Sequence, residues 1–234
     1  MIEFGHGTHV GLRREHNEDT YHADPSAGLW LVADGMGGHA HGEVASAIAR
    51  DTVPARLAEG RGLGDAIRDA DRAIISVSSR RDGMLPMGTT IAALRLAGGQ
   101  YDVAWVGDSR VYLLDQDGFR QLSQDHSYVQ ELVAQGAISE AEARHHPRRN
   151  VVTQALGVTA PDDLQISELH GDALPGMQFL LCSDGLTEEV DNHAIAALLQ
   201  RRELSAQECV DSLILAALEG GGSDNITVLL VRIT

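Results

Sequence analysis

The sequence contains no lysine, since all 18 basic residues among its 234 are arginine. This absence excludes chemistry that needs a lysine amine, such as Schiff-base formation or a phosphate-binding loop built on lysine. Cysteine is almost absent as well, and two residues, Cys182 and Cys209, cannot form a disulfide framework. Both lie in apolar or helical patterns, so we expect them to be small core residues.

Long apolar runs are also missing. None approaches the length of a transmembrane helix, and the first residues lack the pattern of a signal peptide. We therefore expect a cytoplasmic protein with no membrane partner. The net charge of −16 argues against binding to nucleic acid, whose phosphates repel an acidic surface. A chain of this length with 43% hydrophobic residues is expected to form one domain, residues 1–234, with a large core.

The stretch 29–39 organises the rest of the chain. Residues 29–33 are apolar and partly β-branched, which predicts a buried strand. The strand ends in Asp34, and three of the next four residues are glycine. Glycine lets the backbone turn sharply and approach a ligand closely. An Asp-Gly pair is also a common turn, so this stretch alone leaves a plain strand-to-turn junction open.

Acidic residues recur in the same kind of position along the chain. Asp108, Asp184 and Asp224 each adjoin an apolar strand candidate and are flanked by Gly, Ser or Asn, and Glu18 and Asp19 follow an early strand. Mg²⁺ and Mn²⁺ prefer several oxygen ligands, which strand ends can bring together. The recurrence predicts a divalent-cation site.

Hydrophobic periodicity and turn signals predict the remaining elements. Strands are expected at 2–14, 90–96, 101–106, 111–114, 177–182 and beyond 224. The short connection through Asp108 predicts an antiparallel hairpin with this residue at its tip. Helices are expected from 42 to an end or kink near Pro54, and at 63–79, 127–135, 139–144, 192–201 and 205–219, with capping boxes at Ser139/Glu142 and Ser205/Glu208. Residues 80–87 are expected to form a loop.

Six motifs occur in an order that resembles the metal-dependent protein phosphatases of the PP2C (PPM) family, in its bacterial branch. They are Arg14-x-x-x-Glu18-Asp19, Asp34-Gly-Met-Gly-Gly38, Met87-Gly-Thr-Thr90, Gly107-Asp-Ser-Arg110, Ser183-Asp-Gly-Leu186 and Ser223-Asp-Asn-Ile-Thr227. Together they cover nearly the whole chain. The resemblance implies an α+β fold, a four-layer αββα sandwich of two antiparallel sheets flanked by helix pairs. It also implies a flap insertion at about 125–157 that helps to select substrates.

The resemblance implies hydrolysis of phosphoserine and phosphothreonine on proteins by a water that bridges two Mn²⁺ or Mg²⁺ ions. In this interpretation Arg14 binds the phosphate, and Asp34 bridges the two ions. The carbonyl of Gly35 serves one ion, and Asp184 and Asp224 serve the other. Glu18 and Asp19 orient the water around the ions. Asp108 joins Asp184 at a possible third ion.

The resemblance leaves several assignments open. Some relatives carry a histidine, a candidate leaving-group acid, where this sequence has Met36. His39 and His41 lie nearby and are the candidates here, and metal-bound water is the alternative. His145 and His146, next to Arg148 and Arg149, would face a phosphopeptide or else be solvated loop residues. The partners implied are phosphorylated proteins, including a bacterial eukaryotic-like Ser/Thr kinase and its substrates.

Two other functions remain to be weighed. Ser109 superficially resembles the nucleophile of some serine esterases, although that motif belongs before a helix and here joins two strands. A phosphoprotein-binding pseudophosphatase is the second alternative, disfavoured because every carboxylate of the mechanism is present. A thiol-based phosphatase is excluded, because the position that needs an arginine after each cysteine holds Glu188 or Leu215.

Overall fold

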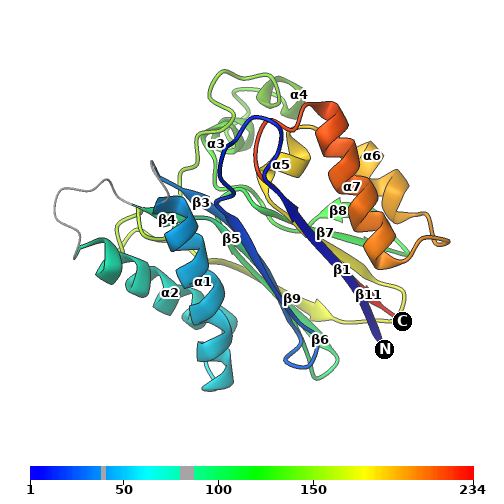
Figure 1. Cartoon of the computed structure of the whole chain (residues 1–234), viewed down its shortest axis with the longest axis horizontal. Helices are drawn as coiled ribbons and strands as arrows, with labels where there is room; N and C mark the ends of the chain where they lie inside the picture. The colour runs from blue at the N-terminus through cyan, green and yellow to red at the C-terminus, as the bar shows by residue number, and fades with distance from the viewer. Residues whose placement is uncertain (38–40, 80–86) are drawn as a thin grey trace.

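The computed structural model describes residues 1–37, 41–79 and 87–234. Two antiparallel sheets pack face to face, and helices cover the outer face of each (Figure 1). Among the described residues, the first sheet contains five strands in the order β1 (Ile2–His9), β11 (Ile226–Ile233), β10 (Gln178–Cys182), β7 (Arg110–Asp115) and β8 (Gly118–Gln121). The second follows the order β2 (Asp19–Asp24), β3 (Leu29–Met36), β5 (Ile91–Ala97), β6 (Gln100–Val106) and β9 (Ser167–Asp172), and β4 (Gly88–Thr89) pairs with β3.

The helices complete a four-layer arrangement. The outer face of the second sheet is covered by α1 (His41–Ala58) and α2 (Leu63–Ser78). The first sheet is covered by α5 (Asp184–Thr187), α6 (Asn192–Leu199) and α7 (Ala206–Gly220). Beyond one end of the sheets lie α3 (Tyr128–Ala134) and α4 (Glu140–Ala143), which belong to the segment 125–157 (Figure 1). The predicted αββα sandwich is confirmed.

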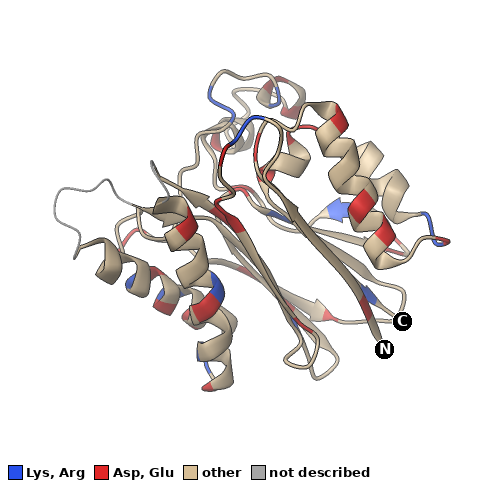
Figure 2. Cartoon of the chain, in the orientation of Figure 1, with Lys and Arg blue, Asp and Glu red and all other residues tan. Residues whose placement is uncertain are grey.

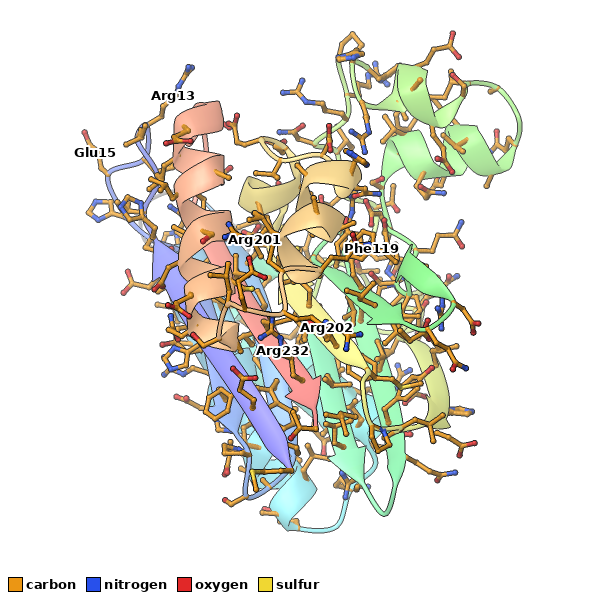
Figure 3. All side chains as sticks on the ribbon, turned by 90° about the vertical axis from the view of Figure 1, so that its right-hand side faces the viewer. Arg13, Glu15, Phe119, Arg201, Arg202 and Arg232 are labelled. Carbon is orange, nitrogen blue, oxygen red and sulfur yellow. The ribbon has the colours of Figure 1, made fainter. Side chains whose placement is uncertain are left out.

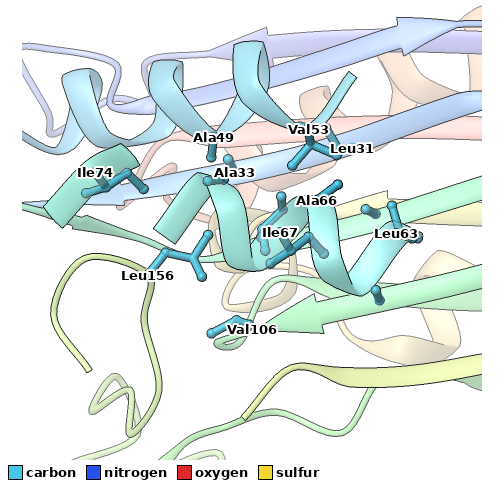
Figure 4. Close-up of a cluster of buried hydrophobic side chains, with 14 of the residues drawn as sticks. Leu31, Ala33, Ala49, Val53, Leu63, Ala66, Ile67, Ile74, Val106 and Leu156 are labelled. Atoms are coloured by element: carbon cyan, nitrogen blue, oxygen red, sulfur yellow. The ribbon is translucent and has the colours of Figure 1, made fainter. Parts of the chain in front are cut away.

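Among the described residues, three hydrophobic cores hold the layers together, one between each pair of neighbouring layers. Trp30 and Phe179 are buried between the two sheets. Leu31 faces the other way, into the core beneath α1 and α2 (Figure 4). Leu213 belongs to the third core, beneath α7. Because side chains alternate along a strand and both faces of β3 are covered, its sequence is apolar at every position of 29–33.

Some element boundaries differ from the prediction. The first strand ends at His9, since the chain turns at Gly11, which has a φ of 84°. Helix α1 continues through Pro54 to Ala58. A proline inside a helix costs about 3 kcal/mol, but Val53 beside it is fully buried against the sheet, and this packing favours the longer helix. Within the described part of the chain, five short elements were not predicted, namely β2, β4, β8, β9 and α5.

The predicted hairpin through Asp108 is wrong. Strand β6 pairs with β5 and β9 in the second sheet, whereas β7 pairs with β10 and β8 in the first. The turn at Gly107 therefore carries the chain from one sheet to the other. Both strands are buried on both faces, so their apolar pattern could not reveal which neighbours they pair with.

The expectations for the cysteines and for the capping boxes are confirmed by the described residues. Both cysteines are free and buried. The capping boxes at Ser139/Glu142 and Ser205/Glu208 begin α4 and α7. Within residues 1–37, 41–79 and 87–234 there is no helix long and apolar enough to span a membrane. The predicted loop falls at 80–87, of which 80–86 lie outside the described residues.

Candidate active site

Asp34 and Asp19 lie side by side because β2 and β3 pair in a register that puts them opposite each other. The hydroxyl of Ser183, which directly precedes α5 in the opposite layers, donates to Asp19 Oδ2 at 2.7 Å. Ser183 also accepts the backbone N–H of Thr227 on β11 at 3.0 Å. These contacts join the two sheets at one end, so carboxylates from both sheets meet there.

Gly35 lies where three segments approach too closely for any side chain. Its N–H donates to the carbonyl of Glu18 at 3.2 Å. A Cβ on Gly35 would stand 2.2 Å from the carbonyl oxygen of Gly42 and 2.6 Å from that of Glu18. Glu18 also accepts the N–H of Gly42, in the first turn of α1, at its Oε1. The glycine after Asp34 is thus required by packing, and Glu18 fastens the start of α1 to the site.

Asp108 lies in the turn that crosses between the sheets. Gly107 before it has a φ of 99°, and a Cβ there would stand 2.6 Å from Thr90 Cγ2. Thr90 supports the turn, since its hydroxyl is 2.7 Å from Ser109 Oγ and its N–H donates to the Asp34 carbonyl at 2.8 Å. Ser109 is 1% exposed. A buried hydroxyl paired with Thr90 supports the site and is poorly placed to act as the nucleophile of an esterase.

Arg14 and Asp224 form an ion pair at the rim of the site. Arg14 Nη2 donates to Asp224 Oδ2 at 2.5 Å, and about half of the arginine side chain is exposed. The pKa of Arg14 is raised first by this hydrogen bond and further by the charges of Asp224, Asp184 and Asp34. The predicted phosphate-binding arginine therefore lies within the field of three predicted cation ligands.

The neighbouring Arg13 behaves differently. Figure 3 shows its side chain projecting outward from the end of the loop, away from the sheets. It has no salt bridge among the described residues, whereas Arg14 bonds to Asp224. Two adjacent arginines are thus distinguished by geometry, and the binding of phosphate by Arg14 stays a prediction.

Burial and mutual repulsion disfavour the charged forms of the clustered carboxylates. Burial raises the pKa of Asp34 and that of Asp184 well above the ordinary value, and the surrounding carboxylates raise both further. Burial likewise raises the pKa of Asp19 to about 6 and that of Asp108 to about 7. Figure 2 shows acidic segments near the upper end of the two sheets. A positive charge among these groups would reverse the repulsion.

Orphaned oxygen atoms indicate where a cation would fit. Asp19 Oδ1 and Asp184 Oδ1 are buried, and neither has a hydrogen-bond partner in the described part of the chain. Buried carboxylate oxygens are costly unless they are paired or bind a metal. In that same part of the chain, no three His, Cys, Asp or Glu side chains already meet around a common point as a finished ligand set. Asp224 instead faces Arg14. The residues fit divalent cations in charge and chemistry, and their role as ligands stays a prediction.

A polar cavity of about 820 Å³ adjoins Asp108 and Asp184 and extends beneath the segment 125–157. Arg144, His145 and Arg149 line it from that segment, and Glu188 and Asp191 are among the residues on the opposite wall. The basic cluster at 145–149, whose role the sequence left open, is therefore divided, because only His145 and Arg149 line the cavity. Arg148 instead lies over the ring of Tyr128, 5.4 Å from its centroid, and His146 lies 5.9 Å from the same ring.

The histidines proposed as leaving-group acids remain untested. His41 is the first residue of α1, and its Nδ1 is buried with no partner among the described residues. His39 lies outside the described residues. Met36 ends β3 opposite Gly88.

Sequence reasoning missed several residues that hold the site together. Asn225, which is buried, accepts the N–H of Glu18 at 2.8 Å and donates to the carbonyls of Val10 and His16 at 2.9 Å each. Arg110 makes a two-pronged ion pair with Asp125, which joins β7 to the start of the segment 125–157. Asn225 and Arg110 each stand inside a motif, so their position carried a signal. Their partners are distant in sequence, and no sequence pattern indicated them.

The comparisons with known proteins agree with this geometry. The model of the family described as "Protein phosphatase 2C" matches residues 7–218. The chain is 39% identical to the serine/threonine phosphatase stp of Listeria innocua over 242 residues, which cover 96% of this chain and 93% of that protein. It is 38% identical to the serine/threonine protein phosphatase PstP of Mycobacterium tuberculosis over 95% of this chain, but it spans only 43% of that protein's length.

Solved structures show the same fold. The catalytic domain of the serine/threonine protein phosphatase PstP, crystallised in complex with two manganese ions, superposes with a TM-score of 0.88 and 33% identity. The match covers 100% of this chain and 98% of that one. The chain belongs to the protein phosphatase 2C family, as a protein-serine/threonine phosphatase of the bacterial type.

Proposed function

We propose that this chain hydrolyses phosphoserine and phosphothreonine on proteins by direct attack of water, at the site between the ends of its two sheets. The observation that carries the proposal is the set of buried carboxylates from both sheets, with raised pKa values and orphaned oxygens, beside an exposed arginine. Such a set suits an enzyme that concentrates positive charge on a phosphate.

Each residue has a proposed role, which is carried over from the matching motif of the family. Asp34, at the centre, would bridge two cations, with the Gly35 carbonyl on one, and Asp184 and Asp224 on the other. Asp19 and Glu18 would orient water around them, and Asp108 with Asp184 would hold a third cation. Arg14 would exchange Asp224 for the substrate phosphate, to which a guanidinium can donate two parallel hydrogen bonds.

Mn²⁺ is the cation we propose first, because the related PstP catalytic domain was crystallised with two manganese ions. Mg²⁺ prefers the same oxygen ligands and is proposed as an alternative. When bound, such ions would position the phosphate, activate the attacking water and offset the developing charge. The chain itself contributes the carboxylates that hold the ions and the arginine that orients the phosphate.

The wider setting is also part of the proposal. The substrates would be phosphorylated proteins, including a bacterial Ser/Thr kinase and its targets, since relatives of this chain are named serine/threonine phosphatases. We further propose that residues 1–234 act as one domain in the cytoplasm. Within it, residues 125–157 would serve as a flap over the cavity beside Asp108.

Phosphate release from phosphoserine and phosphothreonine peptides tests the function directly. Hydrolysis should require Mn²⁺ or Mg²⁺, stop in excess chelator and continue in the presence of a thiol-alkylating reagent, because both cysteines are buried in the core. A carboxylic ester substrate serves as the control for the esterase alternative and should not be cleaved. Full phosphatase activity in excess chelator would contradict the proposal. Cation-dependent phosphopeptide binding without any turnover would instead favour the pseudophosphatase.

A further inference from the structure

His126 lies where the flap segment, residues 125–157, leaves the body of the protein. It makes two hydrogen bonds to one residue of the Asp108 turn. The backbone N–H of His126 donates to the Gly107 carbonyl at 2.9 Å, and the N–H of Gly107 donates to His126 Nδ1 at 3.2 Å. The entry to the flap segment is therefore fastened to the residue that directly precedes Asp108.

These contacts fix the tautomer of the ring. Because Nδ1 accepts the N–H of Gly107, the ring proton lies on Nε2, which then donates to Ser167 Oγ at 3.0 Å. The ring stacks beside Trp105, at 6.3 Å between centroids, and Trp105 Nε1 donates to the carbonyl of Gln124 at 2.8 Å. His126 is thus a neutral bridge from the turn to the edge strand β9.

The turn is held from its other side as well. Gly107 packs against Thr90, and the hydroxyl of Thr90 contacts Ser109 at 2.7 Å. Asp108 lies between Gly107 and Ser109, so Thr90 and His126 restrain the backbone on either side of it. Loss of the bond from the Gly107 N–H to His126 Nδ1 leaves the turn held by the Thr90 contacts and by the backbone bond from the His126 N–H to the Gly107 carbonyl. The imidazole therefore supplies one separate restraint on the turn.

His126 also holds the exit of the flap segment. Its carbonyl accepts the N–H of Thr153 at 2.8 Å. Next to it, Ser127 forms a β-bridge with Val152, and the N–H of Tyr128 donates to Val151 at 2.8 Å. Both ends of the flap segment therefore meet at this one histidine.

We propose that His126 is a positioning residue that couples the flap segment to Asp108 through the N–H of Gly107. The lone pair on Nδ1 sets the direction of the turn, and with it the direction in which the Asp108 carboxylate points. The inference rests on the proposed function, because its consequence is a change in the cation requirement of that reaction. His126 is not among the residues proposed to hold the cations or the phosphate.

Two amide substitutions separate the two ends of the ring. In His126→Asn the side-chain oxygen can take the place of Nδ1 and accept from Gly107, but the side chain is too short to reach Ser167. In His126→Gln the amide extends toward Ser167 and leaves no acceptor at the Nδ1 position. His126→Phe keeps a ring and loses both bonds, and it is the second loss variant in case His126→Gln does not fold. Ser167→Ala is the matched control for the other end.

Amide hydrogen exchange of the cation-free protein is the first measurement. His126→Gln and His126→Phe should speed exchange across 107–109 by about tenfold, the scale of one lost hydrogen bond, whereas His126→Asn and Ser167→Ala should stay near wild type. The second measurement is the Mn²⁺ concentration that gives half-maximal turnover of a phosphopeptide. It should rise by about tenfold in the same two loss variants, with little change in KM for a small aryl phosphate.

The outcomes distinguish the two proposals. If wild type hydrolyses phosphopeptides but His126→Gln and His126→Asn behave alike in both measurements, the positioning role is overturned and the function stands. The positioning role is also overturned if faster exchange spreads evenly over both sheets, as a general loss of stability would cause. If wild type hydrolyses no phosphopeptide, the function fails, and the exchange data alone still decide whether His126 controls the turn.

Discussion

At the scale of single residues, chemistry at this site depends on which of two similar neighbours points inward. Arg13 and Arg14 are adjacent and chemically identical, yet only Arg14 bonds to a carboxylate of the site. Asp108 and Ser109 are also adjacent, but the hydroxyl of Ser109 is hydrogen-bonded to that of Thr90. Residue type alone therefore does not show which side chain takes part in the site. The direction in which the side chain points decides this.

Arg14→Ala is expected to lower kcat/KM for a phosphopeptide by an amount equivalent to about 2–4 kcal/mol, the scale of losing one preorganised charge-stabilising donor. Arg13→Ala, whose side chain projects outward, is the matched control and should change kcat/KM little. Steady-state kinetics at saturating Mn²⁺ provides the measurement. Equal losses in the two variants would show that Arg14 does not bind the phosphate.

At the scale of secondary structure, local hydrogen bonds decide where helices begin, and packing decides how far they run. Helix α7 begins with a capping box in which Ser205 and Glu208 each accept a backbone N–H of the other. Leu213 and Cys209 on this helix are fully buried in the core between α7 and the first sheet. Helix α4 has the same capping box at Ser139 but buries no residue.

Ser205→Ala should therefore reduce the free energy of unfolding by about 1 kcal/mol, the usual cost of removing a serine cap. Ser139→Ala removes the same chemistry from α4, and it should change global stability little because α4 can fray without opening the core. Urea denaturation of both variants in one buffer compares them. The expectation fails if Ser139→Ala is destabilised as much as Ser205→Ala.

At the scale of the whole molecule, the fold brings like charges together, and this arrangement links stability to cations and protons. Asp34 and Asp19 come from the second sheet, and Asp184 and Asp224 come from the segments that begin α5 and precede β11 in the other half. Repulsion among them opposes the folded state when no cation is present. The packing of the two sheets therefore brings these carboxylates together, and their repulsion lowers the stability of the cation-free protein.

Mn²⁺ is expected to raise the melting temperature of wild type, with a gain of about 2.7 kcal/mol at a hundred times the dissociation constant. Asp184→Asn removes one charge and one ligand together. The cation-free variant should be no less stable than wild type, but its Mn²⁺-dependent rise and its turnover should both collapse. A melting series with titrated Mn²⁺ makes the comparison, and an equal rise in the two proteins would show that Asp184 is no ligand.

Asp19 links stability to pH in the cation-free protein. Its pKa is raised from 3.8 to about 6 by burial, so the folded state binds more protons than the unfolded state between these values. This contribution is fully present below pH 3.8 and is lost as pH rises through about 6. Asp19→Asn lacks this contribution.

The unfolding free energy of Asp19→Asn should therefore rise relative to wild type between pH 4 and pH 7, by on the order of 2 kcal/mol. Denaturant titrations in chelator at several pH values measure this difference. Carboxylates far from Asp19 titrate alike in both proteins and cancel in the comparison. Asp34, whose pKa the charge of Asp19 raises, adds to the difference in the same direction. A difference that is flat with pH would mean that Asp19 ionises normally in the folded state.

Much of this protein was determined by local sequence. The apolar run 29–33, the glycine after Asp34 and the serine-glutamate caps each specify a local structure that the chain then adopts, because alternation, steric limits and capping act over a few residues. The six motifs in order indicated the family, and the comparisons confirm it.

Only the tertiary structure decided how these parts meet. The pairing of β6 with β5 and β9, away from β7, could not be predicted, because strands buried on both faces show no preference for a neighbour. The same holds for the ion pair of Arg14 with Asp224, the bond from Glu18 to Asn225 and the bond from Gly107 to His126. Each of these contacts joins residues that are distant in sequence, so no local pattern predicts it. The contact forms only when the two sheets pack together.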